Sequence, residues 1–274
     1  MAKSPDTSAA DVAKPWLASY PSVVKPEIGP IEDTSLGDMM LKACAQFPTR
    51  PAFTSMGKDL TYAELEEAST HVAAWLQARG LQKGARVAIM MPNVLQYPVA
   101  LMAVLRAGYI VVNVNPLYTP RELEHQLKDS GAEAIFILEN FATTLQSIVK
   151  NTQVKHVVVA AMGDMLGFKG HIVNFVVRRI RKMVPAWSLP GHVKFKEVLS
   201  EGRSKTFSKV EVGQDDVAFL QYTGGTTGVS KGATLLHRNI LANVQQTELW
   251  LESAYTKRPR PANLTFVCPL PLYH

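Results

Sequence analysis

A loop rich in glycine and hydroxyl side chains, residues 222–232, carries the residue types best suited to chemistry. It reads Tyr-Thr-Gly-Gly-Thr-Thr-Gly-Val-Ser-Lys-Gly. Glycine lets a backbone take positive φ and approach a ligand closely, and successive backbone amides then converge on phosphate oxygens. The lysine adds a point positive charge. The sequence therefore predicts a cradle for a polyphosphate, built from Gly224, Gly225, Gly228, the hydroxyls of Thr223, Thr226, Thr227 and Ser230, and Lys231.

Two other interpretations of this loop fit less well. A Walker A loop needs Gly-Lys followed by Ser or Thr at the start of a helix. Here Ser230 precedes Lys231, Gly232 follows it, and the next residues have an extended pattern. A flexible surface turn explains the paired glycines but not four hydroxyls and a lysine placed directly after a buried strand. We therefore favour the phosphate cradle.

The elements that must position this loop alternate between strands and helices. The strand patterns are nearly continuously apolar, as strands buried on both faces should be, and they cover residues 86–91, 109–114, 134–138 and 155–160. Two helix starts have capping-box spacing, Thr61 with Glu64 and Thr119 with Glu122, and these helices should end near Gly80 and Gly131. The alternation predicts an α/β fold with mainly parallel sheets flanked by helices.

A second pattern surrounds the loop itself. Residues 217–222 and 232–236 are predicted strands, a helix should begin near Arg238, and residues 264–268 resemble a closing strand. These elements could form a second sheet or a second subdomain, and the sequence leaves both open. His237 is expected to be structural, and Leu236 lacks a side chain that could cap the helix.

Four motifs together resemble the bacterial long-chain fatty acyl-CoA synthetases of the adenylate-forming superfamily. They are residues 90–101, 113–125, 222–232 and 269–274, and the resemblance extends from about residue 33 to 274. It implies an incomplete N-terminal domain of the acetyl-CoA synthetase-like fold. We expect an extended arm over 1–32 and a partial AMP-binding domain over 33–274. Within that domain we expect a first βα subdomain (33–165), a basic connecting segment (166–210) and the phosphate-loop region of a second subdomain (211–274).

The resemblance also implies a reaction and the residues that serve it. A fatty carboxylate attacks the α-phosphate of Mg²⁺-bound ATP, and the thiol of coenzyme A (CoA) then displaces AMP. In the family this loop contacts the nucleotide phosphates, which assigns binding to Tyr222, Thr223, Gly224, Gly225, Thr226, Thr227, Gly228 and Lys231. Lys231 and His274, the last residue of the Pro-Leu-Tyr-His motif, are the expected catalytic residues, and Tyr273 is either a wall of the acyl pocket or core. The metal ligands stay unassigned.

Several motifs of that family would follow His274 and are not in this sequence. They include a magnesium-binding glutamate, the ribose-binding aspartate and the C-terminal domain with its lysine, so we expect this chain alone to have no synthetase activity. A medium-chain or aryl-acid CoA ligase is the nearest alternative. A non-catalytic fragment that binds nucleotide or membrane is another, and the DNA sequence beyond codon 274 would distinguish it.

The charge of the chain is concentrated in one segment. The formal net charge is +6, and residues 169–205 hold nine Lys or Arg against two Glu, so no general affinity for nucleic acid is indicated. Residues 171–184 predict one amphipathic helix that either docks on an anionic membrane or packs on its own domain with a solvated basic face. In that helix Ile172, Val176, Ile180 and Met183 form the apolar face, and His171, Asn174, Arg178, Arg181 and Lys182 lie opposite.

The remaining composition indicates a cytoplasmic protein, either soluble or peripheral on the inner face of the cell membrane. No signal peptide and no uncharged apolar stretch of about 18 residues is present. Cys44 and Cys268 both lie in apolar runs and are expected to be buried thiols. A homodimer of the full-length protein is kept as a hypothesis.

Overall fold

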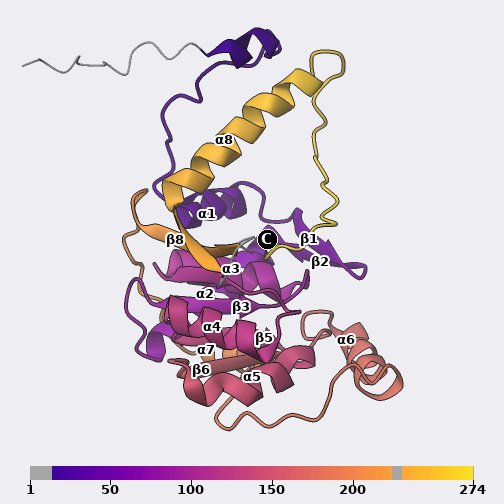
Figure 1. The fold of residues 1–274 in the computed structure, drawn as a ribbon. Helices are drawn as coiled ribbons and strands as arrows, with labels where there is room; N and C mark the ends of the chain where they lie inside the picture. Colours follow the sequence, from indigo (N-terminus) through magenta and orange to yellow (C-terminus); the bar gives the residue numbers. More distant parts are fainter. Residues whose placement is uncertain (1–13, 224–229, 274) are drawn as a thin grey trace, which may run out of the picture. The chain divides into compact units, whose positions relative to one another are not determined.

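The fold was analysed in a computed structural model, which describes residues 14–223 and 230–273 (Figure 1). The chain divides into two compact units. The larger comprises residues 32–241 and 266–274, and the smaller comprises residues 1–31 and 242–265. The larger unit contains the sheet and nearly all of the regular elements, and the candidate site lies within it.

The larger unit is built on a seven-stranded sheet with the order β7-β6-β5-β3-β4-β8-β9. Every neighbouring pair is parallel except β8 and β9, which are antiparallel. The central strands are buried on both faces, which explains their unbroken apolar sequences. The strands are β3 (Arg86–Met90), β4 (Ile110–Asn113), β5 (Ala134–Leu138), β6 (His156–Ala160), β7 (Val193–Lys194), β8 (Val217–Thr223) and β9 (Lys231–Leu236).

Helices cover both faces of this sheet (Figure 1). One layer consists of α1 (Leu36–Gln46), α2 (Tyr62–Ala78), α3 (Gln96–Arg106) and α7 (Phe195–Arg203), which pack on one another. The other contains α4 (Pro120–Ser130) and α5 (Ala142–Ile148). Leu123 and Leu127 of α4 and Leu145 of α5 share a buried cluster with strand residues such as Met90 and Ile137. The predicted α/β fold with a mainly parallel sheet is confirmed.

Both predicted capping boxes are present. Thr61 and Glu64 start α2, and Thr119 and Glu122 start α4, each with reciprocal side-chain and backbone hydrogen bonds. Gly131 ends α4 in the left-handed conformation at φ 62°, which a residue with Cβ rarely adopts. A separate antiparallel hairpin joins β1 (Pro51–Ser55) to β2 (Lys58–Thr61). These local signals therefore determine where the helices begin and end.

Strands β8 and β9 belong to the same sheet as the earlier strands. β8 inserts beside β4, with Val111 opposite Phe219 and Asn113 opposite Gln221. The sheet therefore continues through the phosphate-loop region rather than stopping before it. β7 and α7 likewise attach the predicted connecting segment to the sheet and to α2. The predicted subdomain boundaries stay a prediction.

Two expectations near the end of the chain were wrong. Residues 264–268 form no strand, and no element follows α8 (His237–Ala254) within the described residues. Residues that favour strands form one only where a neighbouring strand supplies hydrogen bonds and packing. Here Phe266 and Val267 are 70% and 88% exposed. Cys268 is consequently exposed, whereas Cys44 is buried as expected, and burial raises the pKa of its thiol.

The basic segment also differs from its prediction. Instead of one helix over 171–184, the chain forms α6 (Phe168–Phe175) followed by a π-helical turn, η4 (Val176–Ile180). Arg178, expected on a solvated face, pairs with the buried carboxylate of Glu139. Ile172, on the face expected either to dock on a membrane or to pack on the domain, is 55% exposed and so is not packed on the domain. None of the helices in the described part of the chain has the length and hydropathy that a bilayer-spanning helix requires.

The remaining described elements are short. The larger unit contains two 3-10 turns, η2 (Glu139–Phe141) and η3 (Val149–Asn151). In the smaller unit, η1 (Pro15–Ser19) is the only regular element of the described N-terminal residues 14–31, and the extended arm stays a prediction. Within that unit the rings of Tyr20 and Trp250 meet edge to face at 5.0 Å.

Candidate functional site

The predicted phosphate loop joins two paired strands. Thr223 ends β8, Lys231 begins β9, and these two residues lie opposite each other in the antiparallel register. Both are exposed, and within the described residues Lys231 takes part in no ion pair. Residues 224–229 lie outside the described residues, so the predictions for Gly224, Gly225, Thr226, Thr227 and Gly228 stay predictions. The hairpin base nevertheless sets a lysine and a hydroxyl side by side.

Helix α4 holds both strands next to this loop. The Tyr222 hydroxyl donates to the carboxylate of Asp129, and burial together with that carboxylate raises the pKa of Tyr222 well above its usual value. One turn earlier on α4, His125 Nε2 donates to the Ser230 carbonyl oxygen at 3.0 Å. Tyr222 therefore anchors the start of the loop through its side chain, and Ser230 anchors the end through its backbone.

The aromatic ring of Tyr222 also explains Gly232. The two residues are partners in the β8–β9 register, and a Cβ built on Gly232 would lie 3.0 Å from the tyrosine ring. That distance is tighter than ordinary van der Waals contact, so a side chain at position 232 would displace the ring by a few tenths of an ångström. The ring is thereby fixed beside the loop.

Residues 268–273 run back to the same region of the sheet. Asn93, which follows β3, donates to the carbonyl oxygens of Cys268 (3.2 Å) and Leu270 (2.9 Å). Its side-chain oxygen accepts from Leu272 N at 2.8 Å. One amide side chain thus satisfies three backbone groups of a segment that has no secondary structure of its own.

A chain of buried polar groups extends this attachment to β4 and β8. The Tyr97 hydroxyl lies 2.7 Å from Asn113 Oδ1 and 2.8 Å from the Leu272 carbonyl oxygen. Asn113 Nδ2 donates to Gln221 at 3.0 Å, and Gln221 Nε2 donates to the Tyr273 carbonyl oxygen at 3.0 Å. Gln221 directly precedes Tyr222, so this network joins residues 272–273 to the strand that leads into the loop. Burial raises the pKa of Tyr97, which keeps its hydroxyl protonated.

The structure therefore brings together parts of the site that are distant in sequence. Tyr222, Thr223, Lys231 and Tyr273 are all attached at the carboxyl end of β8. In an open, mainly parallel sheet, ligands bind outside the carboxyl ends of the strands. His274 lies outside the described residues, and its predicted role stays a prediction.

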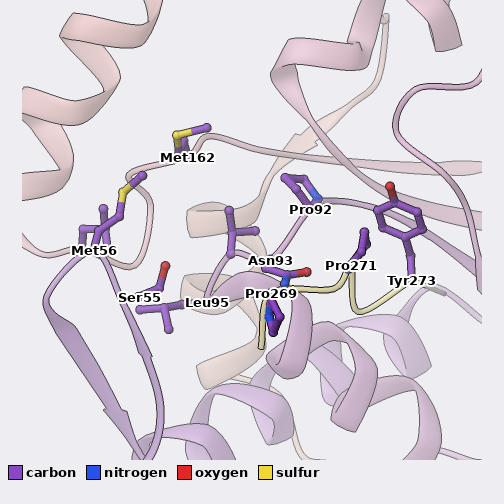
Figure 2. Close-up of a pocket in the computed structure, with 11 residues that line it drawn as sticks. Ser55, Met56, Pro92, Asn93, Leu95, Met162, Pro269, Pro271 and Tyr273 are labelled. Carbon is purple, nitrogen blue, oxygen red and sulfur yellow. The ribbon is translucent and has the colours of Figure 1, made fainter. Parts of the chain in front are cut away.

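An apolar cavity of about 380 Å³ adjoins this segment (Figure 2). Its size lies in the range of small-molecule sites, which are lined mainly by apolar groups. Figure 2 shows Tyr273 beside Pro271 and Pro92 at one side of the lining and Met56 at the other. Tyr273 thus lines a cavity rather than lying in the closed core. That the cavity receives an acyl chain stays a prediction.

Histidine 237 has the structural role that its sequence position suggests. Its side chain is 1% exposed, and Nδ1 accepts a hydrogen bond from Leu36 N at 3.1 Å. Burial lowers its pKa, so the neutral form needed for this bond is the one that the fold retains. His237 therefore joins the start of α8 to the start of α1 within the larger unit.

No metal centre is formed by the described residues. Nowhere in 14–223 or 230–273 do three His, Cys, Asp or Glu side chains come close enough together to hold an ion. Magnesium is usually held by one or two carboxylates together with waters and the phosphates of a substrate. Such a site does not require a cluster of three ligands, and the metal ligands stay unassigned.

Comparison with known proteins identifies the family. The AMP-binding enzyme family matches residues 40–274, and the chain belongs to it. A long-chain-fatty-acid–CoA ligase of Yersinia pestis is 53% identical over 263 residues, covering 95% of this chain and 46% of that protein. The chain therefore spans just under half the length of this curated relative.

Solved structures show the same fold. A long-chain-fatty-acid-CoA ligase from Archaeoglobus fulgidus superposes with a TM-score of 0.62 at 28% identity, over 80% of this chain and 40% of that one. A benzoate CoA ligase from Burkholderia xenovorans gives a TM-score of 0.58 at 20% identity, over 75% and 35%. Because ligases of fatty and aromatic acids share the fold, the fold alone does not select the acid.

Sequence reasoning did not single out the residues that support the loop and the 268–273 segment. Asn93, Asn113 and Gln221 are polar residues within or directly after buried strands, a signal that could have marked them. Asp129 and His125 lie one turn apart on α4, and nothing in their spacing indicates which strand they would meet. Their partners are separated from them by about a hundred residues.

Proposed function

We propose that this chain is part of a long-chain fatty acid–CoA ligase that acts through an acyl-adenylate. In the first step a carboxylate oxygen attacks the α-phosphorus of ATP, and the bond to the pyrophosphate oxygen breaks. In the second step the CoA thiolate attacks the acyl carbon and AMP leaves. The observation that carries the proposal is the 53% identity to a protein of that name across almost the whole chain.

The described residues support a phosphate-binding role at the loop. Lys231 is an exposed cation without an ion-pair partner in the described ranges, and it lies opposite Thr223 at the mouth of a glycine-rich loop. A lysine there would stabilise the charge that develops on the leaving pyrophosphate. The anchoring of Tyr222 and Ser230 to α4 would hold the loop in place, so that little reorganisation accompanies the reaction.

The test is the reaction itself, measured with the protein expressed from the complete reading frame. With ATP, CoA and oleate, we expect acyl-CoA formation and release of pyrophosphate. Lys231→Ala should lower kcat/KM by about a hundredfold, in line with the loss of one preorganised charge. The matched control is Lys150→Ala, because Lys150 is an exposed lysine in η3 that is not part of the loop. Equal activity of the two variants would contradict the assigned role of Lys231.

The same assay distinguishes the acid that is used. Each buried methylene contributes about 0.8 kcal/mol, so a deep pocket favours oleate over octanoate and benzoate. A preference for octanoate or benzoate would support the medium-chain or aryl-acid alternative. No adenylate formation with any of these acids would favour the non-catalytic alternative.

Further parts of the proposal concern cofactors and partners. Mg²⁺ would enter with ATP, and CoA would be the acyl acceptor, as the family resemblance implies. A homodimer of the full-length protein stays a hypothesis, which sedimentation at several protein concentrations would test. Peripheral contact with an anionic membrane through residues 171–184 belongs to the same proposal, and the structure permits a more specific statement of that contact.

A further inference from the structure

Helix α6 and the π-helical segment η4 present an apolar surface to solvent. The apolar face consists of Phe168 (84% exposed), Ile172 (55%), Phe175 (59%), Ile180 (63%) and Met183 (53%). Phe168, Ile172 and Phe175 are spaced by four and three residues and so lie along one side of α6. Contiguous exposed apolar patches of this kind usually mark an interaction site. Figure 1 shows α6 at the margin of the larger unit, away from its sheet.

The opposite side of the same helix is held to the domain by small and polar residues. Gly170 lies against Gly163 so closely that a Cβ on Gly170 would be 1.9 Å from the Gly163 carbonyl oxygen. Asn174 Oδ1 accepts from Gly163 N at 2.8 Å. Arg178 donates to both carboxylate oxygens of buried Glu139 through Nε and Nη2. Val177 is also buried on this side, so the helix is held by one apolar and several polar contacts while its larger apolar side chains face solvent.

The π turn extends the exposed apolar face beyond α6. Arg181 N donates to the Val176 carbonyl oxygen at 2.8 Å, an i to i+5 bond. In an α-helix, residues five apart lie on different sides, whereas in a π turn they lie close to one line. Ile180 therefore continues the face begun by Phe175, while Arg178 still reaches Glu139. π turns inside helices occur frequently at functional sites.

Three exposed cations lie in the same segment as the apolar face. Arg179, Arg181 and Lys182 are exposed and take part in no ion pair within the described residues. The sequence from 165 to 190 contains no Asp or Glu. Apolar side chains beside unpaired cations suit a surface that is apolar inside and negatively charged outside. An anionic lipid layer has this character, and each Lys or Arg near it contributes about 1 kcal/mol.

We propose that the apolar face of α6 and η4 inserts into the interfacial region of an anionic membrane, with Arg179, Arg181 and Lys182 on lipid phosphates. The charge complementarity commits the surface to lipid, because exposed cations without acidic neighbours match the negative surface of an anionic bilayer. The inference rests on the proposed function in one respect, namely that a fatty acid substrate partitions into such a membrane. It goes beyond that function because it assigns the membrane contact to one face of α6 and η4. This face lies opposite to the side that carries Asn174 and Arg178.

The experiment is vesicle flotation of the protein expressed from the complete reading frame, without ATP, CoA or fatty acid. Vesicles of phosphatidylcholine alone are compared with vesicles that also contain phosphatidylglycerol. We expect binding to the anionic vesicles. Phe168→Ser/Ile172→Ser/Phe175→Ser and, separately, Arg179→Gln/Arg181→Gln/Lys182→Gln should each lower the partition coefficient at least about tenfold. Circular dichroism checks the fold, which should persist because these side chains are exposed.

Lys150→Gln/Lys205→Gln/Lys209→Gln is the matched control, because it removes three exposed cations elsewhere. If this control lowered the partition coefficient equally, net charge alone would explain the loss of binding, and the proposal would be overturned. Unchanged binding of the Phe168 triple variant would also overturn it. So would failure of the complete protein to float while residues 1–274 do, since the rest of the chain or a second copy would then cover the face. None of these outcomes bears on acyl-CoA formation, because the ligase assay measures that reaction separately from membrane binding.

Discussion

Histidine 237 shows how one buried side chain ties two elements together at the residue scale. Its imidazole accepts from Leu36 N, which requires Nδ1 to be unprotonated. Burial lowers the pKa of the ring, and nearby Lys83 adds to this effect while Asp216 opposes it. The folded state therefore resists protonation more strongly than the unfolded chain does.

The pH dependence of stability follows from that difference. An unfolded histidine takes up a proton below about pH 6.5, whereas folded His237 does so only at lower pH. Its contribution is complete above pH 6.5 and is lost as the pH falls through the lowered pKa, at up to about 1.4 kcal/mol per pH unit. We expect the melting temperature of the wild type to fall more steeply from about pH 7 to 5 than that of His237→Asn. Parallel melting curves of the two proteins across this range would contradict the expectation.

Lys231 differs from His237, because its charged side chain has no ion-pair partner within the described residues. A lysine of this kind in η3, such as Lys150, would simply be solvated. At the base of a loop that starts from Thr223, the same side chain has a role only if an anion arrives. The phosphate-binding role predicted from residue types stays a prediction, and the structure adds the pairing of Lys231 with Thr223.

At the scale of elements, helix α8 starts with an incomplete cap. Leu236 N donates to Asn239 Oδ1 at 2.8 Å, which is one half of a reciprocal cap. The N–H groups of His237 and Arg238 donate to the carbonyl oxygens of Asp216 and Gln214, but Leu236 has no side-chain oxygen to accept from the N–H of Asn239, the third helical residue. The sequence predicts that a side-chain cap from position 236 is missing, because leucine has no oxygen to accept the hydrogen bond.

Completing this cap should stabilise the chain. Leu236→Thr supplies a hydroxyl at the N-cap, and Leu236→Val is its control because valine has the same shape without the oxygen. We expect the threonine variant to exceed the valine variant in free energy of unfolding by about 1 kcal/mol in urea denaturation. A threonine variant no more stable than the valine variant would show that water already satisfies this helix start.

Helix α6 shows the limit of a prediction made from periodicity alone. The pattern correctly indicates a two-sided helix in the basic segment, but a pattern does not state which side faces the protein. Gly163, Asn174 and Glu139 decide it by binding the polar side. The π turn then changes the spacing from which the faces were predicted.

At the scale of the whole molecule, the segment 268–273 depends on contacts from residues far away in sequence. Asn93 accounts for three of its backbone hydrogen bonds. Because the segment forms no helix or strand, its order rests on such side chains rather than on a backbone ladder. Tyr97 and Gln221 supply further links to the sheet.

Removal of Asn93 should therefore loosen this segment without unfolding the sheet. In Asn93→Ala we expect the amide of Leu272 to exchange its hydrogen at least about tenfold faster, since loss of one hydrogen bond costs about 1 kcal/mol or more. Amides in β3 and β5 should keep their protection and serve as the internal control. Unchanged exchange at Leu272 would mean that Tyr97 and Gln221 suffice.

The sequence by itself determined the features that depend on near neighbours. It predicted the buried strands, both capping boxes, the glycine-rich loop and the family, because apolar runs, caps and motifs are all read within a few residues. Only the tertiary structure decided the features that depend on distant partners. It placed β8 beside β4, attached residues 268–273 to Asn93 and turned the apolar face of α6 outward. Strand pairing and the choice of a buried face are set by long-range contacts, which a local pattern does not contain.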